Sequence, residues 1–253
     1  ILETSLQDWD GAASARQEIL DLEPAELKHY STLEDLYESQ GRWSDLAELQ
    51  TRKCEILEPG ERLETYRSIA GLYENQLQDR EGAFLLYQRA LEDSPTDEES
   101  LSGVERVARD AGLFAELRAV WVVSVEAFEE PLEQMELLRS LAILDKDELD
   151  RPADAVDWFE RIRAIDEDDE EALQALVGLY ESLERWEALA DALEKLAGLT
   201  TDFREQTSIF LRLGDCLKER LDQPEKAVEA YREVLEMDPT EERAIKALED
   251  LYG

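Results

Sequence analysis

Basic residues are scarce in this sequence. Its 253 residues include 27 Lys and Arg against 64 Asp and Glu, which gives a formal net charge of -37. Proteins bind nucleic acid chiefly by placing Lys and Arg on its phosphates, and anionic membrane surfaces attract the same side chains. The scarcity therefore argues against both partners. Two explanations of the acidic excess stay open: attraction of a basic partner, or solubility that includes adaptation to salt.

Histidine occurs once, at His29. Catalytic Ser–His–Asp and Cys–His sets need a histidine beside a nucleophile, and the sequence offers no such set. Glu26 precedes His29 by three residues, as in carboxylate-bridged metal sites, but those sites need a second copy on a facing helix. We therefore expect His29 to lie on a helix surface. We expect no catalytic residue, no metal and no cofactor.

Glycine-rich loops are absent too, because the 11 glycines are scattered along the chain and none forms a phosphate-binding motif. The acidic run at residues 166–171 lacks the glycine and the final spaced Glu of an EF-hand calcium loop. We expect this run to be a solvated turn that leads into a helix, where acidic residues favour the N-terminus.

The only two cysteines are Cys54 and Cys216, and both lie in apolar stretches of helical character. We expect two free thiols far apart in the fold, which favours a reducing compartment such as the cytoplasm and leaves the choice open. No apolar run has the length of a membrane-spanning helix. The chain starts at Ile1 and ends within a repeat, so we expect a segment of a longer protein.

An internal repeat dominates what the sequence does contain. Two markers recur with a period of 72 residues: an apolar residue after an acidic turn, and an alanine followed four residues later by an aromatic. The marker positions are Leu101, Leu173 and Ile245, and Ala83, Ala155 and Ala227. A fixed period is diagnostic of repeat architectures, and 72 residues divide into two helical hairpins of the usual length.

Helix signals recur within each period. Apolar residues at spacings of three and four predict amphipathic helices at 169–183, 186–199, 203–221 and 224–237. The segment 96–99 fits a capping box with Thr96 as the N-cap. Asp150 and Asp222 each stand two residues before a proline, and we expect them to cap the helices that follow.

These residues resemble the tetratricopeptide repeat (TPR) family. The family pattern places an aromatic, a Leu, a small residue and a Tyr on the first helix of a hairpin, then Ala, an aromatic and Pro. The matching positions are Tyr66, Ile69, Ala70, Tyr73, Ala83, Tyr87 and Pro95, and Phe210, Leu213, Gly214, Leu217, Ala227, Tyr231 and Pro239. The resemblance implies an all-α, right-handed superhelical solenoid of about seven antiparallel helix hairpins.

The same resemblance implies one solenoid over residues 1–253. Its parts are the end of a preceding repeat at 1–23, three two-hairpin units at 24–94, 95–166 and 167–238, and the start of a further repeat at 239–253. Small residues at Ala70, Ala142 and Gly214 would let paired helices approach closely. Trp43 and Trp186 recur at one repeat position, so we expect core packing from them rather than a ligand cage.

By resemblance, a peptide or partner domain would bind in a concave groove lined by the first helix of each hairpin. The candidate residues are Arg67, Glu74, Arg106, Arg109, Arg139 and Lys146. Arg106, Arg109, Arg139 and Lys146 belong to neighbouring hairpins and would meet an acidic or C-terminal carboxylate group. The alternative is that they pair with nearby acids on the groove wall. Gly71 and Gly178 stand where chaperone-tail-binding members carry asparagines, so that partner class is not expected.

The sequence therefore predicts a non-catalytic protein–protein interaction scaffold whose partner is a protein or peptide, with no nucleic acid and no membrane insertion. The alternative function is a regulatory or targeting segment of a larger enzyme or sensor protein. The identity of the partner and the oligomeric state stay open.

Overall fold

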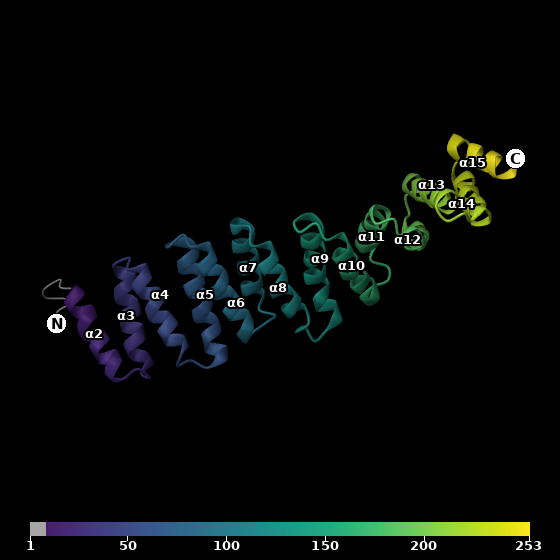
Figure 1. The fold of residues 1–253 in the computed structure, drawn as a ribbon. Helices are drawn as coiled ribbons and strands as arrows, with labels where there is room; N and C mark the ends of the chain where they lie inside the picture. The colour runs from purple at the N-terminus through teal and green to yellow at the C-terminus, as the bar shows by residue number, and fades with distance from the viewer. Residues whose placement is uncertain (1–8) are drawn as a thin grey trace. The chain divides into compact units, whose positions relative to one another are not determined.

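The computed structural model describes residues 9–253, and every regular element among them is an α-helix (Figure 1). The fourteen helices described are α2 (Trp9–Leu22), α3 (Leu27–Ser39), α4 (Trp43–Cys54), α5 (Pro59–Asn75), α6 (Arg80–Asp93), α7 (Glu98–Ala111), α8 (Phe114–Val125), α9 (Pro131–Asp147), α10 (Pro152–Ile165), α11 (Glu170–Ser182), α12 (Trp186–Leu199), α13 (Phe203–Glu219), α14 (Pro224–Met237) and α15 (Glu242–Tyr252). The predicted all-α hairpin repeat is confirmed. None of these helices is long and apolar enough to cross a membrane.

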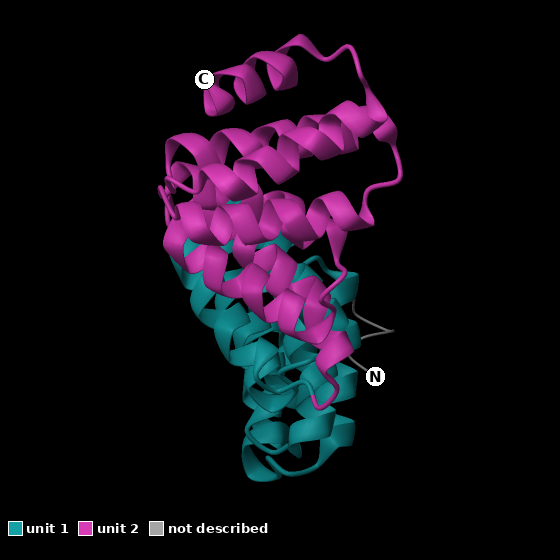
Figure 2. Ribbon diagram, turned by 90° about the vertical axis from the view of Figure 1, so that its right-hand side faces the viewer, with its two compact units in different colours: residues 1–128 teal, residues 129–253 magenta. Residues whose placement is uncertain are grey.

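The helices form two compact units, residues 1–128 (unit 1) and 129–253 (unit 2), which Figure 2 shows in different colours. In unit 1 the hairpins are α3–α4, α5–α6 and α7–α8, preceded by α2. In unit 2 they are α9–α10, α11–α12 and α13–α14, followed by α15. Within each unit every helix packs on the next one along the chain. The prediction of one continuous solenoid, with its repeat boundaries, stays a prediction.

Close packing inside a hairpin depends on small residues, as the sequence indicates. Ala70 and Ala142 are fully buried. Gly214 of α13 faces the ring of Tyr231 on α14, and a Cβ at Gly214 would lie 2.6 Å from that ring. The backbones of these two helices therefore approach to a distance that only glycine permits here. Trp121 is buried in the core, and Trp43 and Trp186 are partly buried.

The observed N-caps show that two predictions about helix starts were wrong. The N-cap of α7 is Asp97, whose carboxylate accepts the Ser100 amide, so Thr96 does not cap. Asp150 and Asp222 do not cap either: Arg151 and Gln223 take the N-cap positions of α10 and α14 and make no side-chain cap bond. The first-turn prolines already lack an N–H, which leaves one donor fewer to satisfy.

Asp150 and Asp222 instead have a left-handed backbone, with φ of 52° at each, as does Gln78 one period earlier with φ of 55°. The turns of the α3–α4, α7–α8 and α11–α12 hairpins have Gly41, Gly112 and Glu184, which also lie at positive φ. A left-handed residue reverses the chain between helices, and aspartate tolerates this conformation better than most residues do. The recurring aspartates therefore mark turns rather than caps.

Candidate partner-binding surface

The six predicted site residues lie on first helices of hairpins. Arg67 and Glu74 are on α5, Arg106 and Arg109 on α7, and Arg139 and Lys146 on α9. We call the exposed sides of α5 and α7 in unit 1, and of α9, α11, α13 and α15 in unit 2, the first-helix face of each unit. All six side chains make ion pairs within their own unit.

Arg67 in unit 1 and Arg139 in unit 2 are 72 residues apart and make equivalent contacts. Arg67 Nη1 lies 3.1 Å from Asp97 Oδ1 and 2.9 Å from Glu99 Oε2. Arg139 Nη2 lies 2.8 Å from Asp169 Oδ2, and its Nη1 lies 3.0 Å from Glu171 Oε2. Because the two aspartates are the N-caps of α7 and α11, each arginine joins a helix to the start of the next first helix.

The electrostatics of this contact are visible at Asp169. Burial acts to raise the pKa of its carboxyl, but hydrogen bonds from Arg139 and from the Ala172 amide outweigh burial, and the pKa is lowered. Asp169 is therefore charged at neutral pH and fixed by both partners. Arg67 and Arg139 are thus primarily structural clamps, with most of their side-chain surface covered.

A second pair in unit 1 joins α7 to α5. Arg106 Nε and Nη2 each donate to a Glu74 carboxylate oxygen at 2.7 Å, and Nη2 also lies 3.3 Å from the Tyr87 hydroxyl. The hydrogen bonds from Arg106 lower the pKa of Glu74. Arg106 stays 51% exposed while Glu74 is 16% exposed. The bidentate pair therefore leaves part of one guanidinium facing solvent.

One period later, unit 2 lacks this pair. Lys146 stands in place of Glu74, and Gly178 of α11 stands in place of Arg106. Lys146 Nζ lies 3.2 Å from Asp147 Oδ1 beside it on the chain, and its side chain is half exposed. A Cβ built at Gly178 meets no atom within 4 Å. At the positions equivalent to the Glu74–Arg106 pair, the first-helix face of unit 2 therefore carries a half-exposed ammonium group on α9 and an uncovered glycine on α11.

The face continues beyond the predicted residues in unit 2. Arg212 Nη2 of α13 lies 2.8 Å from Glu181 Oε2 of α11, and Arg243 Nη2 of α15 lies 2.9 Å from Asp215 Oδ2 of α13. Sequence reasoning missed Arg212, because serine occupies its position in the two earlier periods. Arg109 contacts Glu105 one turn earlier on its own helix, at 2.9 Å.

The remaining candidates for chemistry have structural surroundings. His29 Nε2 lies 2.9 Å from Glu23 Oε2, so its partner is Glu23 rather than Glu26. At residues 166–171 the Asp166 carboxylate accepts the Asp168 amide in a turn before α11. Cys54 and Cys216 are free and buried, and burial raises the pKa of Cys54 to about 11. Within residues 9–253, no cluster of three or more His, Cys, Asp or Glu side chains could hold a metal.

Comparison with solved structures finds helical-repeat proteins. The Naa15/Naa10 complex bound to HypK-THB has a TM-score of 0.52 and 16% identity, over 96% of this chain and 36% of that one. YrrB, described as a TPR protein with an unusual peptide-binding site, has a TM-score of 0.42 and 17% identity, over 73% and 91%. The C-terminal part of a TPR repeat-containing protein from Cytophaga hutchinsonii has a TM-score of 0.44 and 12% identity, over 95% of both chains.

The fold is a TPR-like array of antiparallel helix hairpins. No protein-family model and no curated protein matches the sequence. The TPR fold accounts for the hairpins, the 72-residue period, the small residues inside each hairpin and the aromatic residues packed on them. A repeat fold of this kind does not by itself specify a partner, because function is carried by the side chains on its surface.

Proposed function

We propose that this TPR chain is a non-catalytic scaffold that binds a peptide or a partner domain on its first-helix face. The observation that carries the proposal is the interruption of the ion-pair pattern in unit 2. There Gly178 leaves open space where unit 1 has Arg106, and Lys146 keeps half of its side chain exposed. A surface whose side chains are fixed by clamps loses little entropy when it binds, and Gly178 leaves room on it for a partner.

The chemistry of the gap favours a partner that contributes a carboxylate at this point. Lys146 presents an ammonium group with three donors, and Asp147 is the only acid that the structure places within ion-pair distance of it among residues 9–253. Gly178 exposes helix backbone, so a peptide main chain or a small side chain can approach α11 closely. Arg106 of unit 1 offers a similar, partly exposed cation.

The test is crosslinking pulldown from the source cell with the wild type beside Gly178→Trp and Lys146→Glu. Both changes act on exposed positions, so the fold is retained and only the gap is filled or its charge reversed. We expect both to lose the partner that the wild type recovers. Val123→Trp is the control, because Val123 is an exposed apolar residue on the second helix α8 of unit 1, outside the first-helix face. Retention of the partner by both test variants contradicts the proposal.

The charge swap Glu74→Arg/Arg106→Glu separates direct contact from support in unit 1. The single change Arg106→Glu breaks the pair, whereas the double swap restores it with the exposed charge reversed. A partner lost in the single variant and recovered in the double variant shows that Arg106 only supports the helices. A partner lost in both shows that the exposed guanidinium contacts it.

A further inference from the structure

Unit 2 has a hollowed surface on the side of its second helices. Two adjoining hollows, of about 600 Å³ and 470 Å³, lie among α12, α13 and α14 and share Gly198, Phe210 and Glu233 in their linings. We call this surface the second-helix groove. None of the six predicted site residues lines it, so its occupation is independent of the first-helix face.

The floor of the second-helix groove is apolar and comes mainly from α13. Phe210, Leu213 and Leu217 of α13 follow at spacings of three and four, so they form a stripe along the helix, and Leu221 adds to the lining just beyond its end. Leu213 and Leu217 are buried, whereas Phe210 and Leu221 are only partly covered. At one end Phe203 of α13 is 72% exposed.

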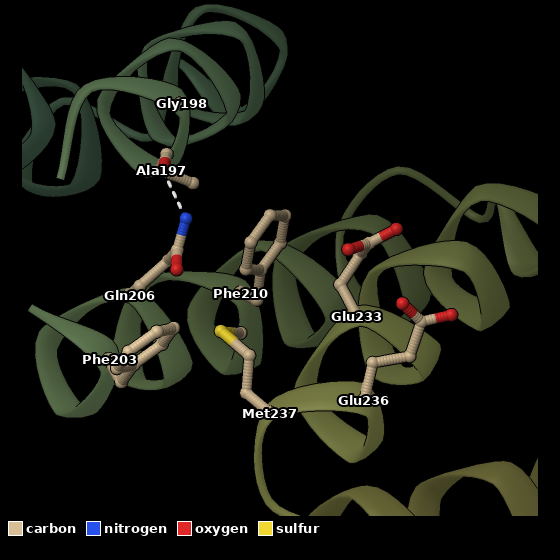
Figure 3. Close-up of a pocket in the computed structure, with 8 residues that line it drawn as sticks. All are labelled: Ala197, Gly198, Phe203, Gln206, Phe210, Glu233, Glu236 and Met237. Carbon is tan, nitrogen blue, oxygen red and sulfur yellow. Dashed lines mark hydrogen bonds between the residues drawn. The ribbon is translucent and has the colours of Figure 1, made fainter. Parts of the chain in front are cut away.

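Figure 3 shows how that end is built. Phe203 and Phe210 of α13 and Met237 of α14 gather their apolar side chains around one hollow. Gln206 Nε2 donates to the Ala197 carbonyl oxygen at 2.8 Å and so ties α13 to the last turn of α12. The hollow is therefore held by helix packing and a defined hydrogen bond, and it keeps an aromatic surface available to a partner.

Both walls of the groove are acidic. Glu187, Asp191 and Glu194 line it from α12, and Glu229, Glu233 and Glu236 line it from α14. All six are exposed, and in each row the spacing is four and then three, so each row lies along one side of its helix. Among the ion pairs of residues 9–253, none involves these six carboxylates. Lys226 is the one base in the lining.

We propose that the second-helix groove binds a basic amphipathic helix of a partner protein. An apolar floor between two acidic rows is complementary to a helix that carries an apolar stripe flanked by Lys and Arg. The apolar stripe would cover Phe210 and its neighbours, and the flanking cations would meet carboxylates that have no cation of their own. A second copy of this chain is a poor occupant, because its net charge of -37 repels the walls.

The test uses a fluorescently labelled synthetic helix about four turns long, with Leu at spacings of three and four and Lys on both flanks. Its binding to the full chain is measured by anisotropy at low and moderate salt. Two control peptides are used, one with the same residues scrambled and one with Glu replacing Lys. The protein variants are Gly198→Trp, which fills the groove from α12, and Glu229→Lys/Glu233→Lys, which reverses one wall. Gly178→Trp on the first-helix face is the control variant.

We expect the designed peptide to bind the wild type and Gly178→Trp equally, and both groove variants at least about tenfold more weakly, since a filled pocket and reversed charges each oppose binding. Equal binding of the scrambled peptide overturns the proposal, because attraction to the acidic surface at large then accounts for the signal. Unchanged affinity in both groove variants also overturns it. Circular dichroism of each variant confirms that the helices are intact. Neither overturning result affects the proposal for Lys146 and Gly178.

Discussion

Equivalent positions in the two units carry the same backbone and different surface chemistry. In unit 1 the Glu74–Arg106 pair joins α5 to α7, whereas unit 2 has Lys146 and Gly178 there and leaves a gap. The clamps at Arg67 and Arg139, in contrast, are alike in both units. The comparison shows that some ion pairs between neighbouring first helices recur with the period, as at Arg67 and Arg139, whereas the Glu74–Arg106 pair is absent from the equivalent positions of unit 2.

The residues of the second-helix groove also differ from those at the equivalent positions of unit 1. Two periods before it, Tyr66 takes the place of Phe210, and Arg62 and Asp93 take the places of Gln206 and Met237. In unit 1 Arg62 Nη2 lies 2.8 Å from Asp93 Oδ1. In unit 1 an ion pair therefore stands at the positions that form an exposed apolar cluster in unit 2. Figure 3 shows the cluster of unit 2.

The largest effect on stability is expected at one repeat position on the inner side of a first helix. Unit 1 has Tyr73 there, and unit 2 has Asp145, which is fully buried and accepts the Trp158 Nε1 proton at 2.7 Å. Asp145→Ala removes this acceptor and leaves a cavity, so we expect the free energy of unfolding to fall by about 2–4 kcal/mol. Urea denaturation followed by circular dichroism measures it.

Asp145→Leu combined with Trp158→Phe is the control for that interpretation. Leucine occupies the equivalent position in the next period, at Leu217, and phenylalanine removes the indole donor. The double variant should recover part of the loss because neither half of the hydrogen bond is then left buried. If it unfolds as readily as Asp145→Leu alone, the Trp158 hydrogen bond is not the source of the effect.

The next largest effect on stability is expected at the Glu74–Arg106 pair, which unit 2 lacks at the equivalent positions. Since Arg106 is half exposed, Arg106→Ala should lower the free energy of unfolding at pH 7 by only about 0.5–1 kcal/mol. The lowered pKa of Glu74 fixes the pH dependence: its contribution is complete above its ordinary pKa of 4.5 and is lost as the pH falls through the lower folded-state value. The wild type and the variant should therefore converge in acid, as measured by urea midpoints across pH 3–7.

Lys146→Ala in unit 2 is the counterpart of that measurement. Lys146 contacts only an adjacent exposed acid, so we expect a change close to zero at every pH. A loss equal to that of Arg106→Ala would contradict the comparison of the two units.

The smallest effect on stability is expected at the turns that join the two helices of a hairpin. Unit 1 uses Gly41 and Gly112 at positive φ, whereas unit 2 has Glu184 with φ of 55° at the equivalent position. Glu184→Gly relieves the left-handed strain and should raise the free energy of unfolding by about 0.5 kcal/mol, the remainder being offset by the greater freedom of the unfolded chain. Thermal unfolding detects the change. A lower melting temperature would show that Glu184 is not strained.

Much of the fold was predictable because its signals are local. Apolar spacing gave the bounds of α12 and α14 correctly and those of α11 and α13 to within two residues. Turn chemistry was harder to predict, since aspartate favours both N-caps and left-handed turns, and at Asp150 and Asp222 the tertiary path of the chain selects the turn. The site was predicted only as a set of first-helix residues. Which of them clamp helices depends on partners about thirty positions away, such as Asp97 and Asp169.

The sequence by itself determined the repeat, the helices, the small residues inside each hairpin and the acidic charge, because these follow from composition and from a fixed period. Only the tertiary structure decided which charges pair and where a surface stays open. Arg139 pairs with Asp169, Lys146 contacts only the adjacent Asp147 and stays half exposed, and the acidic rows of α12 and α14 flank an apolar floor. The physical reason is that long side chains choose partners by distance in space, which the packing of neighbouring hairpins sets.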